Sequence, residues 1–170
     1  DDSVLMEKSP TSSAWAQQMS SEFDNSYFII SIRNPYAVCS GVKKRTMINQ
    51  KHSLPMEQCI AHWITTAKLQ MDNIKSIKNS IWFTYEELCE NPLDIENKLK
   101  SLLPEFENEL DCMFEEEVDV HGDDYGGKIQ NRNEKAIGDL NEDEINIINK
   151  TLKENQELMD FFGYEIREKE

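Results

Sequence analysis

The sequence predicts an α/β fold, a three-layer sandwich with a central parallel sheet, in a single domain over residues 1–170. Two short apolar runs, residues 3–7 and 27–32, flank a segment at 11–23 with helical spacing of its apolar side chains. A strand, a helix and a strand within about 30 residues are typical of a βαβ unit, whose strands are parallel. The run at 27–32, Tyr-Phe-Ile-Ile-Ser-Ile, is almost continuously apolar, as in a strand covered on both faces.

Local signals predict the remaining elements. Pro35 is expected to begin a helix that continues to about residue 46, because proline favours the first helical position. An amphipathic helix is expected over 56–77 and a third strand over 81–84. The other expected elements are a loop at 47–54, helices at 92–103, 105–114 and 141–162, a long polar loop at 115–136 and a helix cap at Gly163.

The acidic composition argues against some classes of binding partner. The chain has 33 acidic and 18 basic side chains, a formal net charge of −15. An acidic surface repels phosphate backbones and anionic lipid, so we expect no nucleic-acid partner. No apolar run reaches the roughly 18 residues that a membrane span needs. The acidic run at 115–124 does not match an EF-hand loop, so we expect a solvated loop there.

The cysteines predict no metal site. None of the four forms a Cys-x-x-Cys pair or has zinc-finger spacing, so each is expected to be a small buried apolar residue. Such usage favours a reducing compartment, and we expect a cytoplasmic protein, with the lumen of the secretory pathway as the alternative. The four are Cys39, Cys59, Cys89 and Cys112.

Arg33 is the strongest candidate for binding an anion. It follows a predicted buried strand, and a helix is expected to begin at Pro35. Ligands of open α/β sheets bind beyond the carboxyl ends of the strands. A helix N-terminus offers N–H donors, and a guanidinium adds a planar fork that fits phosphate or sulfate. The alternative is that Arg33 pairs with a nearby carboxylate.

Three motifs in order resemble those of sulfotransferases that use 3′-phosphoadenosine 5′-phosphosulfate (PAPS). They are Glu-Lys-Ser-Pro at 7–10, Arg-Asn-Pro at 33–35 and Tyr-Glu-Glu-Leu at 85–88 with a proline at 92. The resemblance covers residues 2–103 and implies part of a P-loop NTPase-like sulfotransferase fold. It implies transfer of a sulfuryl group from PAPS to a hydroxyl or amine of a small-molecule or carbohydrate acceptor, leaving PAP as product, without a metal.

The resemblance also implies roles for single residues. Arg33 would bind the 3′-phosphate of PAPS, and Tyr85 would lie near the adenine. Members of the family usually carry a serine eight residues after this arginine, but here that position is Gly41. Ser40 lies one residue early, which is about 100° of rotation on a helix. Backbone N–H groups are the alternative for this second phosphate contact.

The remaining implied roles concern the transfer step and the acceptor. Lys8 would reach the sulfuryl group or an acidic substrate, and Glu7 would act as a base or as the partner of that lysine. A late loop of the family closes over the 3′-phosphate, a role that Lys128 or Arg132 would take. His52, in the loop at 47–54, and the helix residues Lys43 and Lys44 would contact the acceptor. The alternative for the two lysines is a solvated helix face.

The family's loop that holds the 5′-phosphosulfate, Pro-Lys-Ser/Thr-Gly-Thr-Thr-like, is not found in this sequence. We therefore expect an N-terminally truncated domain, the C-terminal two-thirds of a sulfotransferase, which binds PAP weakly and transfers sulfate poorly on its own. The alternatives are a non-catalytic PAP-binding or interaction module of the same fold, and a nucleotide kinase of related fold that depends on Mg²⁺.

Overall fold

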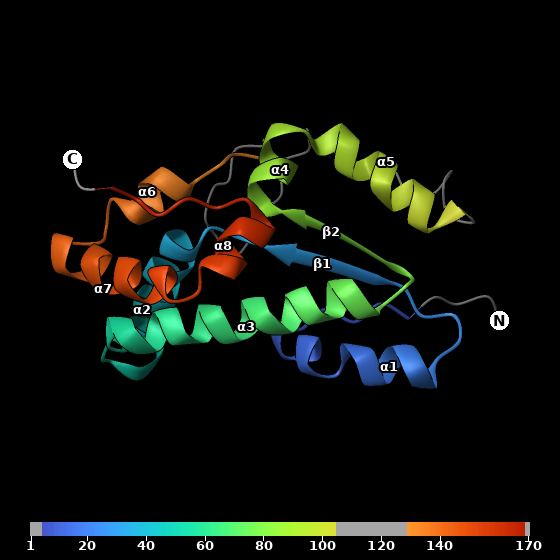
Figure 1. Cartoon of the computed structure of the whole chain (residues 1–170), viewed down its shortest axis with the longest axis horizontal. Helices are drawn as coiled ribbons and strands as arrows, with labels where there is room; N and C mark the ends of the chain where they lie inside the picture. The colour runs from blue at the N-terminus through green and yellow to red at the C-terminus, as the bar shows by residue number, and fades with distance from the viewer. Residues whose placement is uncertain (1–4, 105–128, 169–170) are drawn as a thin grey trace.

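The computed structural model describes residues 5–104 and 129–168 and shows an α/β chain that is mostly helical, with a small parallel sheet. The two strands of this sheet, β1 (Phe28–Ile32) and β2 (Ser80–Thr84), pair in parallel, and Ile32 lies opposite Thr84. Figure 1 shows them side by side and pointing the same way. The prediction of an α/β fold with parallel strands is confirmed in this part, whereas a three-layer sandwich around a central sheet is not shown.

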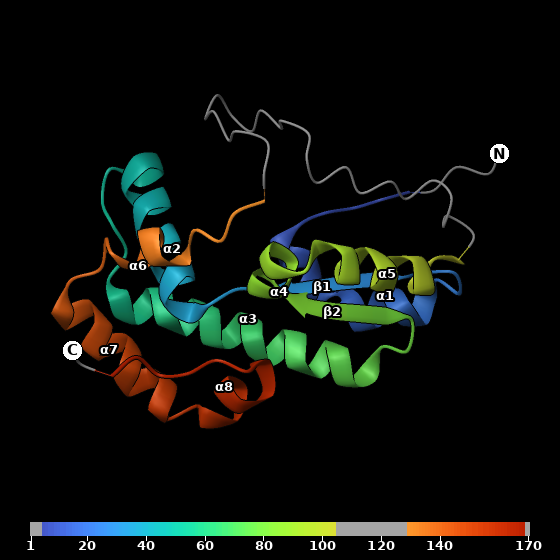
Figure 2. The same ribbon diagram turned by 90° about the horizontal axis from the view of Figure 1, so that it is seen from above.

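Two helices connect the strands. The first, α2 (Pro35–Gln50), begins at the predicted proline but continues four residues past its expected end, so the predicted loop at 47–54 is wrong in its first half. It ends at Lys51, whose φ of 61° is left-handed. The second, α3 (Met56–Ser76), matches its prediction. It runs beside the sheet at one end of the molecule and beside α2 at the other (Figures 1 and 2).

Short helices follow the second strand. Directly after β2 come α4 (Tyr85–Glu90) and α5 (Pro92–Leu102). The helix α4 is absent from the sequence prediction, although Thr84 and Glu87 form a reciprocal capping box at its start. Because Tyr85 is its first residue, the third motif lies on this helix.

The C-terminal part contains three helices, α6 (Asn133–Ile137), α7 (Glu142–Lys153) and α8 (Gln156–Phe162). A single helix over 141–162 was expected, but Glu154 and Asn155 separate α7 from α8. The predicted cap is confirmed, because Gly163 has a φ of 73°. The start of α6 lies within the predicted loop at 115–136. The rest of that loop up to residue 128, and the predicted helix at 105–114, lie outside the described residues.

The strand predicted over residues 3–7 is wrong in its described part, residues 5–7. Residues 5–7 are not in a strand, and the side chains of Leu5 and Met6 are 94% and 86% exposed. The βαβ unit expected from residues 3–32 is therefore not found in the described part. In place of one helix at 11–23, the chain forms a 3₁₀ turn, η1 (Pro10–Ala14), and a short helix, α1 (Ala16–Glu22).

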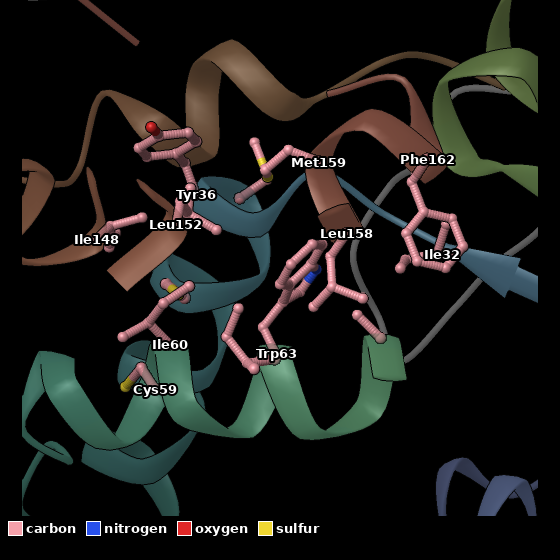
Figure 3. Close-up of a cluster of buried hydrophobic side chains, with 14 of the residues drawn as sticks. Ile32, Tyr36, Cys59, Ile60, Trp63, Ile148, Leu152, Leu158, Met159 and Phe162 are labelled. Atoms are coloured by element: carbon pink, nitrogen blue, oxygen red, sulfur yellow. The ribbon is translucent and has the colours of Figure 1, made fainter. Parts of the chain in front are cut away.

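The main apolar core lies where α3 meets α2, α7 and α8. Figure 3 shows side chains from these helices pointing toward one another around the indole of Trp63, which is 3% exposed. The apolar side chains that recur along α3 with helical spacing are buried here, and they include Cys59, Ile60, Trp63, Ile64, Ala67 and Met71. This core fixes α3 against the start of α2, the segment that carries the candidate site.

Candidate functional site

Arg33 and Tyr85 come together at the carboxyl ends of the two strands. Since Ile32 pairs with Thr84, each of the two motif residues follows its strand by one position. The Cζ atom of Arg33 lies 4.3 Å from the centroid of the Tyr85 ring, which is cation–π stacking. The second and third motifs, which were predicted to share a site, thus meet through these two side chains, and both side chains are half-buried.

The start of α2 differs from the sequence expectation. The Oδ1 atom of Asn34 accepts hydrogen bonds from the backbone N–H groups of Tyr36 (3.0 Å) and Ala37 (3.3 Å). The N–H of Val38 bonds to the carbonyl of Asn34 at 3.0 Å, and Pro35 has no N–H. The expected open N–H groups are therefore already satisfied, and Arg33 itself is the main donor at this strand end.

Glu86 connects three segments of the chain. Its Oε1 atom accepts from the backbone N–H of Asn34 at 3.1 Å and from the side-chain Nδ2 of Asn133. Its Oε2 atom accepts from the hydroxyl of Tyr164 at 2.8 Å. The neighbouring Glu87 forms the capping box of α4 with Thr84. Glu86 instead holds the start of α2, the start of α6 and the C-terminal segment together.

Arg33 is held at its backbone and at its side chain. The indole Nε1 of Trp63 donates to the carbonyl of Arg33 at 2.9 Å. The Nε of Arg33 donates to Oδ1 of Asn133 at 2.8 Å. None of the carboxylates in the described residues forms an ion pair with Arg33. The alternative of a direct arginine–carboxylate pair is thus not found in the part of the chain that the structure describes.

Tyr85 holds the segment that leads into α6. Its hydroxyl donates to the carbonyl of Gln130 at 2.6 Å and accepts from the backbone N–H of Arg132 at 3.2 Å. Burial raises the pKa of this phenol, so it stays protonated at neutral pH. The guanidinium of Arg33 lies over one face of the ring, and contact of Tyr85 with an adenine stays a prediction.

The two candidates for a second phosphate ligand lie differently on α2. Ser40 is buried, at 1% exposure, whereas Gly41 is exposed. A Cβ atom added at Gly41 would meet nothing within 4 Å. The hydroxyl of Ser40 is therefore turned away from solvent, and the helix surface at Gly41 is open.

The other predicted site residues lie away from Arg33 or outside the described part. Glu7 and Lys8 are exposed, and Glu7 accepts from the hydroxyl of Ser12 at 2.7 Å. Their roles at the sulfuryl group stay predictions. Lys128 lies outside the described residues, and Arg132 is half-buried just before α6.

The predicted acceptor residues are on or after α2. Lys43 forms an ion pair of 2.5 Å with Glu144, and Lys44 pairs with Asp139. These pairs join α2 to the C-terminal helices and occupy the two cations. His52 is exposed in the short connection to α3. Contact of these three side chains with an acceptor stays a prediction.

Two shallow hollows occur elsewhere on the described surface. One of about 390 Å³ lies between α3 and the α7–α8 turn and is lined by charged side chains that include Lys68, Asp72 and Glu157. Another of about 540 Å³ lies between β2 and α5, next to Ile81 and Lys98. Neither of these two hollows is lined by Arg33.

Residues 5–104 and 129–168 contain neither a cluster of metal-ligating side chains nor a helix that could span a membrane. No group of three His, Cys, Asp or Glu side chains there could hold a metal ion. In the same residues, no helix has the length and apolar character to cross a membrane. The acidic run at 115–124 lies outside this part of the chain.

Three residues of the site were not identified from the sequence. Asn133 was part of a predicted loop, Trp63 was assigned only to the core, and Tyr164 had no role. Trp63 and Tyr164 each carry one polar group on a large apolar ring. Such side chains usually make a hydrogen bond when they are buried, but the sequence does not show with which partner. Comparison of the chain with family models, curated proteins and solved structures found no match.

Proposed function

We propose that this chain carries the 3′-phosphate-binding part of a PAPS-dependent sulfotransferase, which moves a sulfuryl group to a hydroxyl or amine acceptor. The observation that carries the proposal is the stacking of Arg33 on Tyr85, 4.3 Å from guanidinium carbon to ring centroid. These residues belong to two motifs that resemble the family's motifs in order and spacing. Their meeting at the ends of two parallel strands supports a shared ligand site.

The chemistry of this site suits a phosphate monoester. In the described residues no acceptor bonds to the two terminal nitrogens of Arg33, because its hydrogen bond to Asn133 uses Nε. Two parallel N–H donors match two oxygens of a phosphate, which gives both energy and orientation. The ring of Tyr85, 4.3 Å from the guanidinium carbon, limits where this fork can lie. The cofactor in this proposal is PAPS, with PAP as product, and no metal is required.

The transfer step itself places further requirements on the protein. The acceptor oxygen or nitrogen attacks the sulfur atom, the bond from sulfur to the 5′-phosphate oxygen breaks, and a base takes the acceptor proton. Lys8 and Glu7 are the residues proposed for this step. Since no 5′-phosphosulfate loop occurs in the sequence, we expect the 170-residue chain to bind PAP and to turn over little.

The proposal extends to the architecture. Parallel sheets are normally covered on both faces, yet Ile29 of β1 is 50% exposed. We propose that β1 and β2 belong to a larger central parallel sheet of a three-layer, P-loop-like sandwich. A non-catalytic PAP-binding module is the second candidate, favoured by the glycine at position 41 and by the exposure of Lys8.

Calorimetric titration of PAP tests the proposal. Wild type should bind PAP more tightly than adenosine 5′-phosphate, which lacks the 3′-phosphate. Arg33→Ala should lower PAP affinity about 10- to 100-fold, the range for a charge-assisted hydrogen bond. Arg45→Ala is the matched control, because Arg45 is an exposed arginine farther along α2, and its affinity should stay within about twofold of wild type.

Three results would count against the proposal. Equal PAP affinity in wild type and Arg33→Ala would remove the site. Absence of PAP binding by folded wild type would remove the cofactor. Binding of ATP only in the presence of Mg²⁺ would favour a nucleotide kinase. Sulfate transfer by a longer form of the protein would separate the enzyme from the non-catalytic module.

A further inference from the structure

Asn133 is the buried link between Arg33 and Glu86. It is the first residue of α6 and is 6% exposed. Its Oδ1 atom accepts from Nε of Arg33 at 2.8 Å, and its Nδ2 donates to Oε1 of Glu86. The orientation of the carboxamide is fixed by chemistry, because a guanidinium only donates and a carboxylate only accepts. The backbone N–H of Asn133 is held as well, by Oδ1 of Asn131 at 3.0 Å.

The link separates two opposite charges that would otherwise pair. Direct contact between Arg33 and Glu86 would commit the guanidinium fork to a carboxylate and reduce its attraction for a second anion. With the neutral amide between them, Glu86 anchors the geometry and Arg33 keeps its terminal nitrogens without a described acceptor. Glu86 itself is fixed by the backbone N–H of Asn34 and the hydroxyl of Tyr164.

Two contacts thus hold the guanidinium of Arg33 in place, one with the ring of Tyr85 and one with the side chain of Asn133. The ring of Tyr85 lies 4.3 Å from the guanidinium carbon and limits the group from that side, and the hydrogen bond from Nε to Asn133 fixes one of its edges. A bidentate contact needs both, since two N–H groups must point at two oxygens together.

We propose that Asn133 is a positioning residue, which orients the guanidinium of Arg33 toward a phosphate monoester dianion and does so without neutralising its charge. This inference rests on the proposed function for the identity of the anion, the 3′-phosphate of PAP. The positioning of Arg33 by Asn133 can be measured without any ligand.

The first experiment observes Arg33 directly in the full 170-residue chain. In ¹⁵N-labelled wild type the Nε–H signal of Arg33, assigned by its loss in Arg33→Ala, should exchange slowly with water. In Asn133→Ala the same signal should exchange at least about tenfold faster, because its buried acceptor is gone. Asn97→Ala is the matched control at an exposed asparagine of α5 and should leave the signal unchanged.

The second experiment measures ligand binding in a double-mutant cycle. Asn133→Ala should lower PAP affinity about tenfold and change adenosine 5′-phosphate affinity by less than about twofold. In the Arg33→Ala background, Asn133→Ala should cause no further loss, because its effect acts through Arg33. Asn133→Leu, which fills a similar volume but offers no acceptor, should likewise speed the exchange of the Nε–H and lower PAP affinity about tenfold.

The outcomes separate the two proposals. Unchanged Nε–H exchange in Asn133→Ala, or an equal loss of PAP affinity in the Arg33→Ala background, overturns the positioning role. Protected Nε–H in wild type with no PAP binding leaves positioning in place and removes the proposed function. If Asn133→Ala does not fold, Asn133→Leu carries the test, and wild-type PAP affinity in that variant overturns the inference.

Discussion

The indole nitrogen of Trp63 donates a hydrogen bond of 2.9 Å to the carbonyl oxygen of Arg33. Trp63 lies on α3 in the middle of the core, and Arg33 is the first residue after β1. The contact joins the most buried part of the molecule to the residue that we propose binds the ligand. The ring of Trp63 also packs edge-on against Tyr164, with centroids 6.3 Å apart.

Removal of the indole nitrogen should destabilise the fold. In Trp63→Phe the carbonyl of Arg33 loses its partner and the smaller ring leaves space in the core. We expect the free energy of unfolding in urea to fall by about 2–4 kcal/mol. Trp15→Phe is the control, because Trp15 is 61% exposed, and its change should stay within about 0.5 kcal/mol. Equal effects of the two substitutions would contradict this description of the core.

Gly41 should accept side chains at a gain in stability. It lies inside α2, its φ is not positive, and a Cβ there meets nothing within 4 Å. Gly41→Ala should therefore raise the free energy of unfolding by about 0.5–1 kcal/mol, the helix cost of glycine. Gly41→Ser should gain less stability but raise PAP affinity above that of Gly41→Ala in calorimetry. Equal PAP affinity in the two variants would show that this position does not face the ligand.

Loss of the Tyr164 hydroxyl should weaken the contact between the C-terminal segment and Glu86. Burial, followed by the nearby carboxylate of Glu86, raises the pKa of Tyr164, so the phenol donates its proton over the whole neutral range. Tyr164→Phe should cost about 1–2 kcal/mol in urea unfolding at pH 7. Tyr27→Phe serves as the control, since Tyr27 is 40% exposed. A cost no larger than that of the control would be inconsistent with the hydrogen bond.

Acid should weaken the contact between α2 and α7. Burial alone would raise the pKa of Glu144, but hydrogen bonds from Lys43 and from the backbone of Asn141, with the charge of Lys43, lower it below its ordinary value of 4.5. A lowered folded-state pKa gives stability that is present above the unfolded-state pKa and is lost as pH falls through the folded value. Wild type should thus be more stable than Glu144→Gln at pH 7, and the difference should shrink below about pH 4.5.

The measurement is urea unfolding of both proteins across pH 3–7. A difference that stays constant over this range would show that the ionised form of Glu144 does not contribute. Since Lys43 supplies the opposite charge, Lys43→Met should remove most of the same pH dependence.

Local signals predicted much of the fold. Pro35 begins its helix, Gly163 ends the last one, and the apolar spacing of α3 gave its buried stripe. The helix α4 was missed although the Thr84–Glu87 capping box is readable in the sequence. The apolar run that includes Leu5 and Met6 predicted a strand, but a strand also needs a neighbour to pair with, which a local pattern does not supply.

The site could be predicted only in part. Arg33 and Tyr85 were assigned from motifs at strand ends, and the structure brings them together. The role of Asn133 could not be predicted from the sequence. Its hydrogen bond with Arg33 joins residues 100 positions apart, and no sequence periodicity relates the two. The expected N–H groups at the start of α2 were taken by Asn34, a competition that depends on one side-chain rotamer.

The length of α3 also affects how the protein unfolds. This one helix touches β1 and β2 at one end and α2 and α7 at the other, with α8 between them (Figure 2). Neither end can separate from the other without exposing part of the same apolar stripe to water. We therefore expect the described parts to melt in a single cooperative transition, with the central amides of α3 among the last to exchange with heavy water.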